Sequence, residues 1–257
     1  MTRKYFIVIG IFIVSVFIIF AIARVFEYIY DSGIHYPKGL TDFNDTSDFE
    51  IDPNTILSDL NRGKTDVFKP APATPLAINT PLSSGSYPWH QSDYLKVAGA
   101  LHQFAWRESL DGWSLYSMVF GTICLDNRGG FDAVDLTYYK QLNGEKGYTI
   151  HEMEIYPIGG RVTWGGGDDF SRPLFGWKSI NLDRMKVTAD DALQIAEQTG
   201  GKEFRIKYNN SCDISILLKP NGDVSDWIVA YFAQGSSNIF EIHINPYTGE
   251  YNILPGK

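Results

Sequence analysis

Cysteine is scarce in this chain: Cys124 and Cys212 are the only two among 257 residues. Neither belongs to a C-x-x-C pair, which excludes a zinc ribbon and a thioredoxin-type redox site. In an oxidising compartment the two sulfurs would form one disulfide, and otherwise they would be two buried free thiols. The sequence leaves both alternatives open.

Positive charge is also in short supply, since the formal net charge is -8. A protein that follows a nucleic-acid backbone needs a stripe of Lys and Arg, so we expect no nucleic-acid partner. Acidic surfaces are repelled by anionic lipid head groups as well. We therefore expect contact with the lipid bilayer only through a hydrophobic anchor.

Motifs of familiar catalytic and cofactor sites are missing. The chain has no H-E-x-x-H and no G-x-S-x-G, and its glycine-rich stretch at residues 165–167 is not followed by G-K-[ST]. Zinc peptidases, α/β-hydrolases and phosphate-loop enzymes need these patterns to hold a metal, a nucleophile or a phosphate. The sequence thus predicts a protein that is not an enzyme and has no cofactor.

Only one long apolar run is present, from Tyr5 to Ala23, and it contains no charged residue. It is long enough for a helix to cross a bilayer core of roughly 30 Å at about 1.5 Å per residue. Arg3 and Lys4 precede it, which favours a cytoplasmic N-terminus. We predict a cytoplasmic tip at residues 1–4, a signal anchor at residues 5–24 and an extracytoplasmic remainder. Cleavage after Ala23 would instead release a secreted form.

Residues 25–88 change from an acidic stretch to the proline-rich segment KPAPATPLAINTPLSSGSYP. Proline lacks a donor N–H and resists both helices and inner strands. This composition predicts a stalk below a folded head. Within the stalk, residues 51–66 could form a short helix capped by Asn54 or Thr55.

The head is expected to begin near Trp89, and its first unit spans residues 89–180. Apolar residues at three- and four-residue steps predict a helix from Asp93 to Glu108, with Ser92 as its N-cap. Two-residue alternation between turns rich in Gly and Asn then predicts antiparallel strands. We expect these strands at residues 113–125, 133–141, 148–156 and 161–164. A flexible loop built on Gly165–Gly167 follows.

A second unit, residues 181–257, has the same order of elements. Thr188 and Asp191 have the spacing of a capping box, and Gly200 with Gly201 predicts the end of the helix. Alternating patterns then predict strands at residues 203–208, 212–219, 226–232, 239–244 and 251–254. The predicted fold class is α+β: an N-terminal transmembrane helix, then two helix-plus-antiparallel-sheet units.

The segments VTADDALQIAEQTGG and WIVAYFAQGSSNIFEIHINPYTGEYNI contain a helix ending in A-L-x-I-A…G-G, an aromatic strand and a closing T-G-E hairpin. Together they resemble the PepSY domain, which occurs in propeptides of secreted peptidases and in anchored bacterial proteins. The resemblance covers Val187 to Leu254. It implies binding or inhibition of a peptidase, and it implies no catalytic residues.

The candidate binding surface includes two tryptophans, Trp164 and Trp177, which flank the glycine-rich stretch and are expected to be exposed. Exposed aromatic rings offer a large contact area. Asp168 and Asp169 lie in the same stretch. If this stretch bound an ion, a hard cation such as Ca²⁺ would suit the two carboxylates.

Glu241 and His243 complete the candidate surface, because they alternate onto the outer face of one strand. A carboxylate beside an imidazole raises its basicity, although such a pair is also common on a solvated face. Glu152 and Glu154 likewise share a strand face, opposite to His151. These carboxylates and His243 define one enzymatic alternative, a hydrolase.

The sequence favours a binding or regulatory module that contacts an extracytoplasmic protein or peptide through an edge strand and the loops beside it. Modulation of a peptidase or envelope protein would be its role. The alternatives from other classes are the hydrolase and a purely structural envelope spacer.

Overall fold

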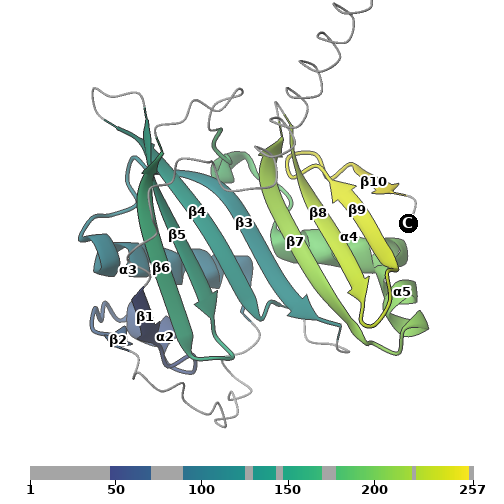
Figure 1. Cartoon of the computed structure of the whole chain (residues 1–257), viewed down its shortest axis with the longest axis horizontal. Helices are drawn as coiled ribbons and strands as arrows, with labels where there is room; N and C mark the ends of the chain where they lie inside the picture. Colours follow the sequence, from purple (N-terminus) through teal and green to yellow (C-terminus); the bar gives the residue numbers. More distant parts are fainter. Residues whose placement is uncertain are drawn as a thin grey trace, which may run out of the picture.

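The computed structural model describes residues 47–70, 89–124, 130–142, 147–169, 178–221 and 224–254. Within these ranges ten strands form one sheet, in the order β10-β9-β8-β7-β3-β4-β5-β6-β1-β2 (Figure 1). All neighbouring strands pair antiparallel. The described part of the chain is therefore organised around a single sheet.

The strands are β1 (Ser47–Glu50), β2 (Lys69–Pro70), β3 (Ser114–Ile123), β4 (Ala133–Gln141), β5 (Tyr148–Tyr156), β6 (Arg161–Asp169), β7 (Cys212–Asn221), β8 (Val224–Ala233), β9 (Ile239–Ile244) and β10 (Tyr251–Leu254). The helical elements are α2 (Ile56–Asn61), α3 (Gln91–Trp106), the 3₁₀ turn η1 (Leu182–Arg184), α4 (Ala189–Ala196), the π turn η2 (Glu197–Gly201) and α5 (Lys202–Lys207).

The two longest helices, α3 and α4, cover the same face of the sheet (Figure 1). Because side chains alternate along each strand, every second residue of a strand faces these helices and the others face away from them. Phe120 of β3 and Trp227 of β8 are buried on the helix-covered face, and Tyr94 of α3 packs against Phe120 with ring centroids 5.8 Å apart. The core thus lies between the helices and the sheet.

The predicted fold class is wrong. The two expected helix-plus-sheet units are not separate, because β3 and β7 pair from Met118↔Leu218 to Ile123↔Asp213. This pairing satisfies main-chain groups that would otherwise lie at two exposed sheet edges. One continuous ten-stranded sheet is the result.

The prediction of a single-pass membrane protein is corrected as well. Among the described residues, no helix is both long and apolar enough to cross a bilayer. Residues 1–4 and 5–24, for which the cytoplasmic tip and the anchor were predicted, lie outside the described residues.

Part of the predicted stalk belongs to the folded body. Residues 47–70 form β1, α2 and β2, and β1 pairs with β6 from Ser47↔Trp164 to Glu50↔Arg161. Ile56 and Phe68 are buried in the core. The short helix predicted in this segment is α2, and Thr55 is its N-cap residue.

Two local predictions differ from the structure. Residues 203–208 were expected as a strand, whereas residues 202–207 form the helix α5. The predicted end of the preceding helix is present, because Gly200 adopts a non-helical φ of 135°, which a glycine accepts without strain, and a kink there separates two helices. Residues 165–169, expected as a loop, belong to β6, where they pair with β5.

A disulfide joins the two halves of the sheet just beyond the β3–β7 pairing. Cys124 and Cys212 are bonded, with Cα atoms 5.1 Å apart, and the Cys124 main-chain N–H donates to the Cys212 carbonyl at 2.8 Å. The bond closes a loop with a sequence separation of 88 residues. A cross-link of this length removes much conformational freedom from the unfolded chain.

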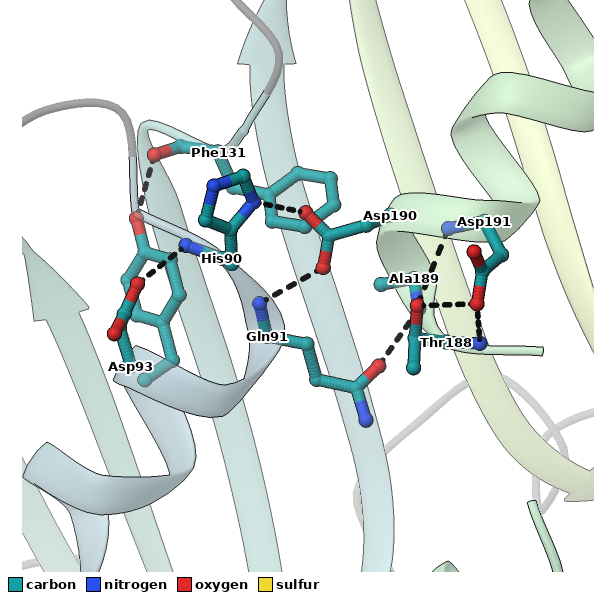
Figure 2. Close-up of polar contacts among 9 residues, drawn as sticks. His90, Gln91, Asp93, Phe131, Thr188, Ala189, Asp190 and Asp191 are labelled. Carbon is teal, nitrogen blue, oxygen red and sulfur yellow. Dashed lines mark hydrogen bonds and ion pairs between the residues drawn. The ribbon is translucent and has the colours of Figure 1, made fainter. Parts of the chain in front are cut away.

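The N-termini of α3 and α4 are also tied together (Figure 2). The Asp190 carboxylate of α4 accepts from the Gln91 main-chain N–H at 3.0 Å and lies 2.6 Å from His90 Nδ1. In return, the Gln91 side-chain oxygen of α3 accepts from the Ala189 main-chain N–H at 2.7 Å. Each helix therefore caps an otherwise unpaired N–H group of the other helix.

Replacing both cysteines, as in Cys124→Ala/Cys212→Ala, should lower the free energy of unfolding by about 2–4 kcal/mol, because the unfolded chain regains the entropy of an open loop. Urea unfolding of both proteins measures this difference. Reductant should lower the wild type to a similar level and leave the double variant unchanged. A wild type that is insensitive to reductant would contradict a stabilising disulfide.

Candidate functional site

Two buried histidines meet between α3 and the sheet. His102 lies on α3 and His151 on β5, and His102 Nε2 is 2.9 Å from His151 Nδ1. Their exposed fractions are 0% and 4%. We call these two residues, with Glu108, Trp106 and Trp113 around them, the histidine cluster.

The protonation of both rings follows from the hydrogen bonds. His102 Nδ1 donates to the Glu108 carbonyl oxygen at 3.0 Å, because a carbonyl can only accept. In a neutral ring this leaves a lone pair on His102 Nε2, so His151 Nδ1 must carry the proton that is shared between the rings.

Burial keeps both rings neutral. It lowers the pKa of His102, and it lowers the pKa of His151 to about 3, with the nearby His102 and Lys140 as smaller causes. Taking a charged imidazolium out of water is unfavourable, so the neutral form dominates. The pair consequently offers nitrogen lone pairs at ordinary pH.

Two tryptophan rings hold His151 in place. Trp106 stacks on the imidazole at a centroid distance of 3.8 Å and an angle of 10°, and Trp113 stacks at 4.0 Å and 24°. Gly166 of β6 is the direct partner of His151 in the sheet, and a Cβ at Gly166 would lie 2.9 Å from His151 Cδ2. The glycine leaves space for the ring.

Glu108 follows α3 and brings a carboxylate to the cluster. One ligand-type atom from each of His102, Glu108 and His151 lies within 4.8 Å of the other two. Lys140 Nζ is 3.5 Å from Glu108 Oε2, and the side chains of Lys140 and Glu108 are 42% and 40% exposed. The cluster is therefore buried at its histidines and open at its carboxylate.

On the face of the sheet that points away from α3 and α4, Glu152 and Glu154 of β5 lie beside β4. Glu152 is paired with Thr137 and Glu154 with Asp135. Burial, followed by the charges of Asp135 and Glu154, raises the pKa of Glu152 to about 7. Glu152 and Glu154 therefore do share a face opposite to His151, as the alternation predicted.

Trp164, predicted to be exposed, packs instead against the core. Its ring lies 4.5 Å from that of Phe49 and 5.9 Å from that of Phe104. Asp168 accepts a hydrogen bond from Thr149 Oγ1 at 2.7 Å. Trp177 and the side chain of Asp169 lie outside what the structure describes.

Glu241 and His243 do come together: His243 Nε2 is 2.7 Å from Glu241 Oε1, and both side chains are about one-third exposed, at 30% and 33%. Ile242, which lies between them in the sequence, and Ile244, which follows His243, are fully buried. The pair lies on the face of β9 opposite to Ile242 and Ile244, next to the edge strand β10.

The turn between β9 and β10 is built by Asn245. Its side-chain oxygen accepts from the main-chain N–H groups of Tyr247 at 2.9 Å and Thr248 at 3.0 Å, and Gly249 adopts a φ of 81°. The Asn245 N–H donates to the Glu250 carbonyl at 2.8 Å. This hydrogen bond fixes the register between β9 and β10, and β10 is the last strand of the sheet.

The β10 edge, Tyr251–Leu254, is exposed along its whole length. Because hydrogen-bonded and non-hydrogen-bonded pairs alternate from Asn245 and Glu250 onward, the main-chain groups of Tyr251 and Ile253 point away from β9. Their side chains are 53% and 44% exposed. The β10 edge thus combines outward hydrogen-bonding groups with apolar side chains.

The opposite edge of the sheet differs in character. It is formed by β2, which consists of Lys69 and Pro70. A charged residue and a proline are common devices against unwanted strand pairing. Between the two edges that the structure describes, β10 is the one open to a further strand.

The residues expected in the hydrolase do not form one site. Glu152 and Glu154 lie on β5, whereas Glu241 and His243 lie on β9, and β4, β3, β7 and β8 come between them. Five inter-strand spacings correspond to roughly 24 Å. Proton transfer between the two groups is excluded at this separation.

A hollow of about 330 Å³ lies beside β1 and α2. Its lining includes Glu50, Asp52 and Asp59, together with Lys64 and Lys69. Asp66 also lines it, so four acidic residues face two lysines there, and Lys64 Nζ lies 3.0 Å from Asp59. We assign no site to this hollow.

The histidine cluster was missed in the sequence. His102 occupies a buried position of α3, in an otherwise apolar stripe, and this was the available signal. Glu108 was not singled out although it lies only six residues after His102, and the proximity of His151 to His102 depends on where β5 lies under the helix. Sequence spacing alone does not report that position.

No known protein family, curated protein or solved structure matches this chain. The predicted resemblance to the PepSY domain finds no support in these comparisons. We therefore transfer no fold or function from that family.

Substituting Gly166→Ala should lower the free energy of unfolding by about 1–3 kcal/mol, because the new methyl group would press on His151 and on the Ile150 carbonyl. Gly121→Ala on β3 is the matched control, since a Cβ there meets no described atom within 4 Å. Chemical unfolding measures both. Equal stabilities of the two variants would argue against the close packing of His151.

The variant Glu152→Gln tests the raised carboxyl pKa. Folded Glu152 keeps its proton up to about pH 7, whereas the unfolded chain loses it near 4.5. The folded state binds more protons in this window, so wild-type stability is lost as pH rises through it. Relative to wild type, the variant should gain about 1–3 kcal/mol between pH 4 and pH 8. The exposed Glu203→Gln is the control, and a flat difference for Glu152→Gln would refute the shift.

Proposed function

We propose that this chain is a binding module that takes up an extended peptide segment of a partner protein along the β10 edge. The single observation that carries the proposal is the outward direction of the Tyr251 and Ile253 main-chain groups at an exposed, apolar sheet edge. An added strand gains affinity from main-chain hydrogen bonds and specificity from alternate side chains.

The side chains around the β10 edge define the chemistry of the partner. Tyr251 and Ile253 lie opposite Ile244 and Ile242, so they extend the apolar face of the sheet. A partner strand would place apolar residues beside them at every second position. This contact covers apolar surface that is otherwise open to water.

The other face of β10 favours polar or basic residues. Asn252 and Leu254 lie opposite His243 and Glu241, next to the Glu241–His243 pair. The formal net charge of -8 attracts a basic partner over longer distances. We therefore expect a segment in which apolar and basic residues alternate.

Binding of a fluorescent peptide of alternating Val and Lys to the full-length chain, followed by fluorescence anisotropy, tests this function. Ile253→Pro should weaken binding by roughly tenfold or more, because proline removes the outward N–H. Ile253 donates no hydrogen bond to β9, so the hairpin should survive. An unchanged melting temperature would show this.

Two controls distinguish strand addition from non-specific binding of the peptide. Ile158→Pro changes an exposed apolar residue in the β5–β6 turn, and it should leave peptide affinity unchanged. A Val–Glu peptide should bind much more weakly than the Val–Lys peptide. Equal binding of both peptides, or full affinity in Ile253→Pro, would refute the proposed function.

A further inference from the structure

We propose that His102, Glu108 and His151 form a binding site for one divalent transition-metal ion of the zinc class. The three residues come from α3, from the segment after it and from β5, and their ligand-type atoms lie within 4.8 Å of one another. This site is separate from the β10 edge and does not depend on the proposed peptide binding.

The spacing of the two imidazoles fits a metal-binding pair. His102 Nε2 and His151 Nδ1 are 2.9 Å apart. Two nitrogen ligands of a tetrahedral zinc ion, each at about 2.1 Å from it, are about 3.4 Å apart. An opening of a few tenths of an ångström would replace the shared proton by an ion. His151 would then carry its proton on Nε2 and stay neutral.

The ring orientations are fixed before any ion binds. His102 Nδ1 donates to the Glu108 carbonyl oxygen, which aims Nε2 at the site. Metal-bound histidines commonly use their second nitrogen in this way. His151 is held between Trp106 and Trp113 at centroid distances of 3.8 and 4.0 Å. Little conformational freedom remains to be lost on binding.

Charge and donor type indicate which ion would bind. Glu108 supplies one negative charge, and Lys140, which now lies 3.5 Å from it, is exposed enough to turn toward solvent. Two nitrogen donors and one carboxylate suit zinc and its neighbours in the transition series, whereas calcium and magnesium prefer oxygen ligands throughout. Three protein ligands leave a fourth position for water or a small molecule.

Titration of chelator-treated, full-length protein with ZnCl₂ in a calorimeter tests this proposal. We expect saturable binding at one site, and Glu108→Gln and His102→Gln should each weaken it by roughly tenfold or more. Glu108 is partly exposed, so Glu108→Gln should keep the fold. Weaker zinc binding by this variant would then not be explained by unfolding. Melting curves of each variant check this point.

A matched control comes from the surface pair on β9. His243→Gln and Glu241→Gln remove a histidine and a carboxylate that lie 2.7 Å apart, and they should leave zinc affinity unchanged. Visible absorption of bound Co²⁺ should change in Glu108→Gln and not in Glu241→Gln, because only a ligand alters the metal spectrum.

Three outcomes would overturn the proposal. They are a wild type without saturable zinc binding, a Glu108→Gln variant that binds zinc as tightly as wild type, and a loss of binding in His243→Gln. Each outcome would leave His102 and His151 as a buried hydrogen-bonded pair alone. Ile253→Pro should retain full zinc affinity, so failure of the peptide proposal and failure of the metal proposal are distinguishable.

Discussion

The pairing of β3 with β7 is the constraint on which the rest of the structure depends. It joins Met118–Ile123 to residues almost a hundred positions later in the chain and turns two sets of strands into one sheet. The disulfide at Cys124 and Cys212 closes the same junction. Because α3 and α4 then lie on one face, their N-termini can meet at Asp190 and Gln91. Pairing, cross-link and helix caps support one another.

This arrangement places the two proposed sites in different halves of the sheet. The β10 edge ends the half that contains β7, and the histidine cluster lies under α3 in the half that contains β3. The first is an exposed surface of main-chain groups and apolar side chains. The second is an interior group whose two histidines are buried and whose Glu108 carboxylate is partly exposed. The two sites share no residue and bind through different groups, so each can be present without the other.

Local features of the sequence predicted local structure well. The Thr188–Asp191 capping box is present, with the Asp191 main-chain N–H donating to Thr188 Oγ1 at 3.2 Å. Ile242 and Ile244 are buried, as alternation in β9 required. Residues 202–207 show the limit of such patterns: a short segment fits both strand and helix periods, and packing of Phe204 near Tyr231 accompanies the helix.

The sequence by itself determined which side chains share a face, where α4 begins and how the β9–β10 turn is made, because these depend on residues within a few positions of each other. Only the tertiary structure decided that β3 joins β7, that Asp190 caps α3, and that His151 lies against His102. These contacts join residues dozens of positions apart, and their choice depends on which strand order best satisfies main-chain hydrogen bonds and buries apolar faces together.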